Sequence, residues 1–187
     1  YTFSLHDALP ICTNVVVPSG TNFTVPTGNA ILGQAISRLD GKQTSKGVEA
    51  EFQWQPMLNW QLQGGYAYDH AYIAQSITDP FSIGKSLVNA PRSSANFWSR
   101  YNIPRGRLLG LGFGLGVVYV GKQWAGDPTT DLYYLMPAWT RVDGAVYYRF
   151  GRRYDLALNI HNLLDKRYIS SSQSATTLNA GEQIGRA

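Results

Sequence analysis

The chain has 187 residues, of which 13% are aromatic and 15% are charged, whereas an average soluble domain is about one quarter charged. This composition indicates a partly apolar surface, and a formal net charge of +4 is too small to identify an anionic partner. No run of about 18 apolar residues occurs, which excludes a membrane-spanning helix, and a single cysteine excludes an internal disulfide.

The first twelve residues, YTFSLHDALPIC, resemble a translated sequencing adapter, and we leave residues 1–12 out of the fold argument. His6 and Cys12 are then no part of a native metal site or nucleophile. We assign residues 13–187 to one β-barrel domain that begins with the end of a strand at residues 13–17. A loop rich in Gly, Pro, Thr, Asn and Ser follows at residues 18–45.

Alternation of apolar and polar side chains predicts the strands of a transmembrane β-barrel. The clearest case is residues 46–55, where Val48 and Phe52 lie on one face and Glu49 and Glu51 on the other. One face suits lipid and the other suits water. The same period predicts further strands at residues 60–69, 93–103, 109–119, 141–150 and 155–161. Trp98 breaks the alternation, because it falls on a polar face.

Glycines occupy every second position from Gly110 to Gly116 within one predicted strand. A nucleotide-binding loop is excluded because the spacing is not Gly-x-Gly-x-x-Gly and no Lys-Ser/Thr pair follows. A face of small residues instead allows neighbouring backbones or an internal domain to approach closely.

The predicted connections alternate between short and long. Short turns are expected at residues 56–59, 104–107 and 151–153, and long loops at residues 18–45, 75–91 and 125–137, with a polar, strandless loop at 170–187. All tight connections therefore lie at one end, which is periplasmic in bacterial outer-membrane barrels. Aromatic residues near strand ends suit the two interfacial girdles: Trp60, Tyr68, Tyr101, Trp124, Trp139 and Tyr154.

Arg141, Asp143 and Arg149 alternate with apolar residues on one predicted strand. A charged side chain on the lipid face costs about 2 to 4 kcal/mol near the midplane. These three side chains are therefore expected to line the barrel interior.

Residues Asn162, Leu163, Leu164, Asp165, Lys166, Arg167 and Tyr168 resemble the N-L-[LF]-D-K-x-Y stretch of TonB-dependent outer-membrane receptors. Residues 137–148 are similar to the P-[GA]-[YW]-T-R-V-D strand of that family, and residues 45–51 and 89–91 are similar to two further family patterns. The Asn-Ala-Pro and Thr-Arg-Val-Asp versions look most like the ferric-siderophore branch.

The resemblance implies an all-β, antiparallel barrel of about 22 strands with a plugged lumen, of which this chain supplies six or seven. It implies transport rather than catalysis, with no resident cofactor or metal and a ferric siderophore as the transported ligand. The implied partners are TonB, through an N-terminal region that the chain lacks, outer-membrane lipid and the ferric chelate, and not nucleic acid. The implied location is the outer membrane of a Gram-negative bacterium, and we expect a fragment truncated at both ends.

Exposed aromatic residues of the long loops and cations of the interior are the candidate ligand-binding residues: Phe81, Trp124, Tyr133, Tyr134, Arg100, Arg141 and Arg149. Aromatic stacking and positive charge would together bind an anionic chelate. The alternative interpretation is structural, with aromatics in girdles and interior arginines paired with Asp143 or Asp155.

Other functions fit the alternation as well. The ligand of a TonB-dependent receptor can instead be cobalamin, haem or a glycan. A passive porin-type barrel would show the same strands without the motif at residues 162–168. An enzymatic barrel would need a fixed Ser, His and acid constellation, for which only His70 and His161 remain, without a Gly-x-Ser-x-Gly motif.

Overall fold

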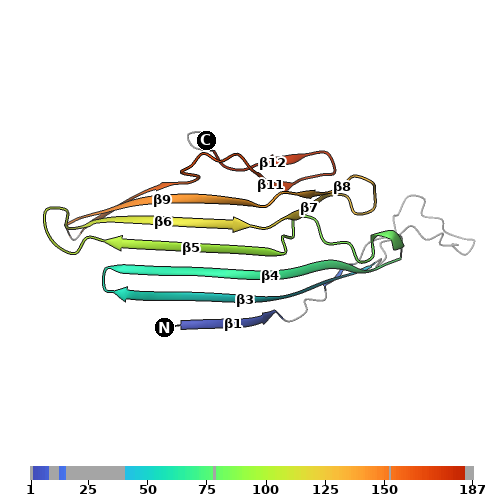
Figure 1. The fold of residues 1–187 in the computed structure, drawn as a ribbon, viewed down its shortest axis with the longest axis horizontal. Helices are drawn as coiled ribbons and strands as arrows, with labels where there is room; N and C mark the ends of the chain where they lie inside the picture. Colours follow the sequence, from blue (N-terminus) through green and yellow to red (C-terminus); the bar gives the residue numbers. More distant parts are fainter. Residues whose placement is uncertain (1, 9–12, 16–40, 78, 152, 184–187) are drawn as a thin grey trace, which may run out of the picture.

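The computed structural model describes residues 2–8, 13–15, 41–77, 79–151 and 153–183. In these residues the chain forms one long, curved antiparallel sheet with a pair of small hairpins at one end (Figure 1). The sheet order is β1-β3-β4-β5-β6-β9-β10, and β2 also pairs with β3. The strands of the sheet are β1 (Thr2–Ala8), β2 (Thr13–Val15), β3 (Gly41–Met57), β4 (Trp60–Ser76), β5 (Ser93–Asn102), β6 (Leu111–Val120), β9 (Trp139–Phe150) and β10 (Tyr154–Ile160).

The other elements belong to the long connections. They are the 3-10 turn η1 (Pro80–Ser82) and the hairpin strands β7 (Gln123–Gly126), β8 (Tyr133–Met136), β11 (Ile169–Ser172) and β12 (Leu178–Ala180). Among the described residues, no helix has the length and apolar character needed to span a membrane.

The register gives the sheet one apolar and one polar face. Phe52 pairs with Gly64, Gly64 with Phe97, and Phe97 with Val117, so apolar side chains continue across four strands on one side. On the other side Gln63 pairs with Trp98 and Gln61 with Arg100. Large apolar residues of the first face stay exposed: Val48, Phe52, Trp54, Tyr66, Phe97, Phe113, Leu115, Val146, Leu156 and Leu158. An apolar face of this extent suits lipid, which confirms the predicted transmembrane wall.

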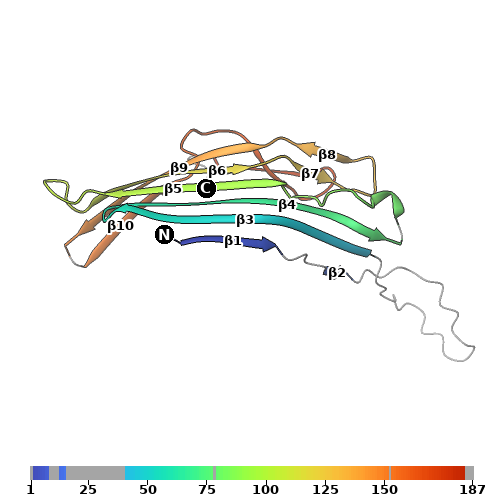
Figure 2. The same cartoon turned by 60° about the horizontal axis from the view of Figure 1, so that its bottom comes forward.

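The connections also follow the predicted alternation. β3 joins β4, and β9 joins β10, through tight turns at one end of the sheet, and the connections with η1 and the two hairpins lie at the other end (Figure 1). Figure 2 shows that the sheet bends as a barrel wall does, and its outermost strands are β1 and β10. We call the two ends the short-turn end and the long-loop end.

Several predicted boundaries were wrong, and the errors share one cause. β3 begins at Gly41 rather than at residue 46, and β4 runs to Ser76 rather than ending at residue 69. These extensions pair with each other, as in Thr44 with Tyr72, beyond the apolar band. Residues 41–45 carry no large apolar side chain on either face, so the sequence no longer alternates there.

The long loop predicted at residues 125–137 lies in a connection that contains a short hairpin, and the expectation of no further strand at residues 170–187 was wrong. β7 pairs with β8, and β11 pairs with β12. Strands of three or four residues are too short to leave a periodic signal. β6 begins at Leu111 rather than at residue 109, because Leu109 and Leu111 donate to Gly106 and Leu108 in a turn.

Residues 2–8, which we left out of the fold argument, form the edge strand β1 on β3. An open edge accepts any extended segment through backbone hydrogen bonds, so this pairing carries little information about origin. The adapter-like interpretation of residues 1–12 stays a prediction, and Cys12 and residues 16–17 lie outside the described residues.

Trp98 lies on the glycine face of the sheet, which explains its break in the alternation. A Cβ atom at Gly114 would lie 2.5 Å from Cζ2 of Trp98, and one at Gly116 would overlap the same ring. The indole therefore fills the space that the missing side chains leave. The small residues of β6 allow a close approach, as predicted, and the group that approaches them is the ring of Trp98 on the neighbouring strand.

Candidate functional site

Three long connections meet at the long-loop end and are joined by hydrogen bonds. The side chain of Asn89 binds Ser172 twice: Nδ2 donates to the Ser172 carbonyl at 2.7 Å, and the Ser172 N–H donates to Oδ1 at 2.7 Å. The Asn89 N–H donates to the carbonyl of Trp124 at 2.9 Å, and Nε2 of Gln123 donates to the Ser170 carbonyl at 2.8 Å. Residues 79–92, the β7–β8 hairpin and the β11–β12 hairpin thus form one unit, here called the loop platform.

Trp124 and Tyr133, two predicted ligand-binding aromatics, stack on each other within this platform. Their rings lie 4.3 Å apart at an interplanar angle of 3°, and Nζ of Lys85 lies 5.5 Å from the centroid of Tyr133. The Tyr133 hydroxyl donates to the Ser86 carbonyl at 2.8 Å. Burial raises the pKa of Tyr133, so the phenol stays protonated at neutral pH. The stack lies within the β7–β8 hairpin, and the Tyr133 hydroxyl attaches it to the connection that contains Ser86, so both rings have partners within the chain.

The other two predicted aromatics differ in exposure. The Tyr134 hydroxyl donates to the Ala175 carbonyl at 3.5 Å, a long bond between β8 and the β11–β12 hairpin. Phe81 lies on η1 and is 87% exposed. Of the four, Phe81 offers the most free ring surface to a ligand.

The turn between β7 and β8 is held by Asp127. Its Oδ1 accepts from the N–H and the hydroxyl of Thr129, at 2.9 and 2.7 Å. The backbone bond and then the hydroxyl bond lower the pKa of Asp127, because both favour the carboxylate. This turn places Pro128, whose carbonyl accepts from Nζ of Lys85 at 2.5 Å.

The three predicted arginines all lie on the polar face, as expected, yet in different settings. Arg149 pairs with Asp155 at 2.7 Å, and both side chains are largely exposed. Arg100 lies 4.0 Å above the ring of Tyr147, and its Nε donates to Asn102 at 3.4 Å. A hollow near the short-turn end is lined by these residues, namely Arg100, Asn102, Tyr147, Arg149 and Asp155. Of its two arginines, Arg100 has no ion pair among the described residues.

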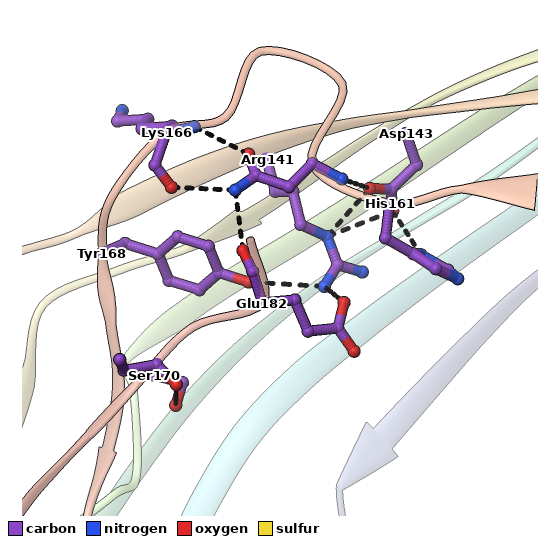
Figure 3. A network of polar contacts seen from close by, with 9 residues as sticks. Arg141, Asp143, His161, Lys166, Tyr168, Ser170 and Glu182 are labelled. Carbon is purple, nitrogen blue, oxygen red and sulfur yellow. Dashed lines mark hydrogen bonds and ion pairs between the residues drawn. The ribbon is translucent and has the colours of Figure 1, made fainter. Parts of the chain in front are cut away.

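Arg141 is the centre of a separate polar network, shown in Figure 3. Its Nε lies 3.0 Å from Oδ1 of Asp143, and its Nη1 donates to Glu182 at 2.6 Å and to the Tyr168 hydroxyl at 3.4 Å. His161 contributes Nδ1 at 3.6 Å from Asp143. Arg141 is thus occupied by partners within the chain, as the structural alternative predicted.

The motif at residues 162–168 completes this network around a buried asparagine. Asn162 is 0% exposed, and its backbone N–H donates to Asp143 at 2.8 Å. Its Nδ2 donates to the carbonyls of Lys166 and Glu182 at 2.9 and 2.7 Å, while its Oδ1 accepts from the Lys166 N–H at 3.0 Å. Every hydrogen-bonding group of the amide is satisfied, so the motif fixes the turn that follows β10.

The hydrophobic and aromatic residues of the motif attach the same turn to β9. The ring of Tyr168 stacks on Trp139 at 4.3 Å, and the N–H of Leu163 donates to Val142 at 2.7 Å. Trp139 therefore lies on the polar face and Trp124 in the loop platform, so the expectation that these two tryptophans belong to the girdles was wrong. Leu164, Asp165 and Arg167 are exposed.

Sequence reasoning missed the residues that join the loops, namely Lys85, Ser86, Gln123, Ser172 and Glu182. They lie in polar segments without periodicity, and only the Asn-Ala-Pro motif pointed to one partner, Asn89. In the described part of the chain no three His, Cys, Asp or Glu side chains gather as a metal site. The arrangement can present aromatic rings and cations to a solute.

An open antiparallel sheet with an apolar outer face, a polar inner face and organised loops at one end defines part of a membrane β-barrel wall. The family description "TonB dependent receptor-like, beta-barrel" matches residues 13–163. The chain belongs to the TonB-dependent receptor family, whose members are transport proteins of Gram-negative outer membranes and not enzymes.

Curated relatives agree with this family. The chain is 32% identical over 142 residues to the metal-pseudopaline receptor CntO of Pseudomonas aeruginosa (strain UCBPP-PA14), covering 76% of the chain and 20% of that receptor. It is 29% identical over 177 residues to the ferrioxamine B receptor of Salmonella typhimurium (strain SL1344), covering 83% of the chain and 24% of the receptor. The chain therefore spans between a fifth and a quarter of these relatives.

Solved structures show the same fold. The siderophore receptor PiuA from Acinetobacter baumannii superimposes with a TM-score of 0.64 at 24% identity, over 80% of this chain and 22% of that one. The pyoverdine receptor FpvA from Pseudomonas aeruginosa PAO1 gives a TM-score of 0.65 at 23% identity, over 91% of this chain and 24% of that one. At these identities the likeness shows the fold alone.

Proposed function

We propose that the protein to which this chain belongs imports a ferric siderophore across the outer membrane, with energy supplied through TonB. The observation that carries the proposal is the set of relatives matched over most of the chain, which are named as receptors for metal-pseudopaline, ferrioxamine B and ferrichrome. All three names describe receptors for metal complexes or siderophores.

Within this proposal the chain supplies part of the external binding surface and part of the inner wall. Phe81 offers an exposed ring on the loop platform, and Arg100 offers a cation on the polar face without an acidic partner among the described residues. An aromatic ring and a guanidinium suit a chelate that is itself aromatic or anionic. Arg141, Arg149 and the Trp124–Tyr133 stack are occupied within the chain, so they are expected to shape the site rather than contact the ligand.

The partner TonB is assigned through the family, and the resemblance places its contact in a segment that precedes the barrel. The described residues supply wall and loops, so the proposal assigns no TonB contact to them. The lipid partner follows from the apolar outer face.

The full-length gene, expressed in a strain that lacks its own siderophore receptors, tests the proposal. Growth under iron limitation is measured with ferrioxamine B, ferrichrome or a ferric catecholate as the sole iron source, in tonB-positive and tonB-deleted backgrounds. We expect growth on at least one ferric chelate and its loss without TonB. Growth that persists without TonB would indicate a passive pore, and growth on haem alone would indicate another ligand class. Either result contradicts the proposal.

A further inference from the structure

The outer face of β3 and β4 changes from apolar to polar at one level. On β3 the outward series Trp54, Phe52 and Val48 is followed by Lys46. On β4 the series that includes Tyr66 and Tyr68 is followed by His70. The register pairs Val48 with Tyr68 and Lys46 with His70, so the change falls at the same height on both strands.

Arg92 lies beside these two residues and adds a second cation to Lys46. Nη2 of Arg92 is 3.3 Å from Nε2 of His70, and the N–H of Asp69 donates to the Arg92 carbonyl at 3.0 Å, which holds the backbone of Arg92 against β4. The ring of Tyr72 lies 5.0 Å from that of His70. We name Lys46, His70 and Arg92 the outer cationic triad.

No acidic side chain among those described neutralises the triad. The ion pairs of the described residues join Arg141 to Asp143 and Glu182, Arg149 to Asp155, and His161 to Asp143. Asp69 neighbours the triad in sequence, but it belongs to the opposite face of β4 and accepts a hydrogen bond from Ser45. The triad therefore presents positive charge outward, toward the surroundings of the barrel and away from its interior.

The height of the triad matches a lipid headgroup. From Met57 to Val48 the outer face of β3 advances nine residues, which at a rise of about 3.3 Å and a tilt of about 40° spans roughly 23 Å. That distance is close to the apolar band of about 25 Å in outer-membrane barrels. Lys46 and His70 are the next outward positions, and Tyr66, Tyr68 and Tyr72 lie at the level of an aromatic girdle.

We propose that the outer cationic triad binds the phosphorylated headgroup of a glycolipid in the outer leaflet. Lysine and arginine make short, charge-assisted hydrogen bonds to phosphate oxygens, and a cation close to a charged membrane surface contributes measurably to binding. A phosphomonoester just above the apolar band can accept hydrogen bonds from Lys46 and Arg92 together. The acyl chains of the same glycolipid would then cover Val48 and Phe52. The site lies on the lipid side of the wall and is separate from the proposed ligand path.

The full-length receptor tests this proposal in nanodiscs made of phosphatidylcholine with a few mole per cent of lipid A. Lipid A that stays bound after transfer to detergent is counted by native mass spectrometry. The double variant Lys46→Gln/Arg92→Gln removes two cations of the triad. The matched control, Arg105→Gln/Arg107→Gln, removes two exposed cations from the short-turn end, at the opposite boundary of the membrane.

We expect the triad variant to retain lipid A about tenfold less than the wild type, and the control to retain it fully. Lipid A that has lost its phosphates is expected to bind the wild type weakly, to the same extent as intact lipid A binds the triad variant. Inorganic phosphate is expected not to displace lipid A from the wild type. Equal retention by wild type and triad variant would overturn the proposal, as would displacement by inorganic phosphate. Circular dichroism melting of both variants verifies that each is folded, and His70→Gln serves as a second, milder variant.

Discussion

A hydrogen bond between the backbone of the buried residue Asn162 and the carboxylate of Asp143 connects the end of β10 to β9. The backbone N–H of Asn162 donates to Oδ1 of Asp143 at 2.8 Å, and Asp143 in turn holds the guanidinium of Arg141. Asn162 has a positive φ of 54°, a conformation that asparagine tolerates better than most residues. The turn after β10 therefore depends on this residue for both its backbone and its hydrogen bonds.

Replacing Asn162 with Ala is expected to lower the free energy of unfolding of the full-length receptor by about 2 to 4 kcal/mol. The change leaves two part-buried carbonyls and one N–H without their described partner and places alanine at a strained φ. Urea unfolding in detergent micelles, followed by circular dichroism, measures the effect. Asn159→Ala, at an exposed position on β10, is the matched control and is expected to change stability by less than about 0.5 kcal/mol.

Asn89→Ala is expected to detach the β11–β12 hairpin from the loop platform without unfolding the sheet. The variant loses both 2.7 Å hydrogen bonds to Ser172, worth together about 1 to 3 kcal/mol. Hydrogen exchange of residues 169–180 should accelerate roughly tenfold or more. Asn179→Ala removes an amide that bonds only Ser171 in the same hairpin, and comparable acceleration in that control would contradict the role assigned to Asn89.

Gly116→Ala is expected to destabilise the barrel by about 1 to 3 kcal/mol, because its Cβ would overlap the ring of Trp98. Trp98→Ala should suppress part of that cost in the double variant, which thermal melting can measure as a coupling energy. Gly144→Ala is the control, because its Cβ would lie 3.6 Å from Leu163, an ordinary contact. Additive effects of the Trp98 and Gly116 changes would show that the ring does not occupy the glycine face.

The β7–β8 turn is expected to loosen at acidic pH. The pKa of Asp127 is lowered in the folded state, so its stabilising effect is fully present above the ordinary value of 3.8 and disappears as the pH falls through the lower folded value. The protection of the Thr129 and Thr130 amides, measured as the exchange rate relative to the intrinsic rate at the same pH, should therefore decrease at pH values below about 3.8. Asp127→Asn should show fast exchange at pH 7 as well, whereas Asp131→Asn, in the same turn, should behave as the wild type.

Phe81→Ala and Arg100→Gln are expected to weaken uptake of the ferric chelate, each by about three- to tenfold, if the proposed function holds. The measurement is the initial rate of uptake of radioactive iron against chelate concentration. Leu58→Ala is the control for Phe81, because Leu58 is 97% exposed at the short-turn end. Arg105→Gln is the control for Arg100. Unchanged uptake in both variants would place the ligand contacts on other parts of the receptor.

The sequence alone determined the wall of this protein. A two-residue period separates Val48 and Phe52 from Glu49 and Glu51, and that separation is a local property of extended chain, so it can be read without a structure. The same period placed Arg141, Asp143 and Arg149 on the inner face. The motif at residues 162–168 identified the family, which the comparison of residues 13–163 confirmed.

Only the tertiary structure decided how the predicted site residues are used. Arg141 meets Glu182, 41 residues later, and Asn89 meets Ser172, 83 residues later. Such contacts depend on which loops the sheet brings together at one end, and polar loops carry no periodic signal that encodes their partners. The sequence could therefore propose Trp124, Tyr133 and Arg141 as ligand contacts, whereas the fold shows that neighbouring segments of the same chain already occupy them.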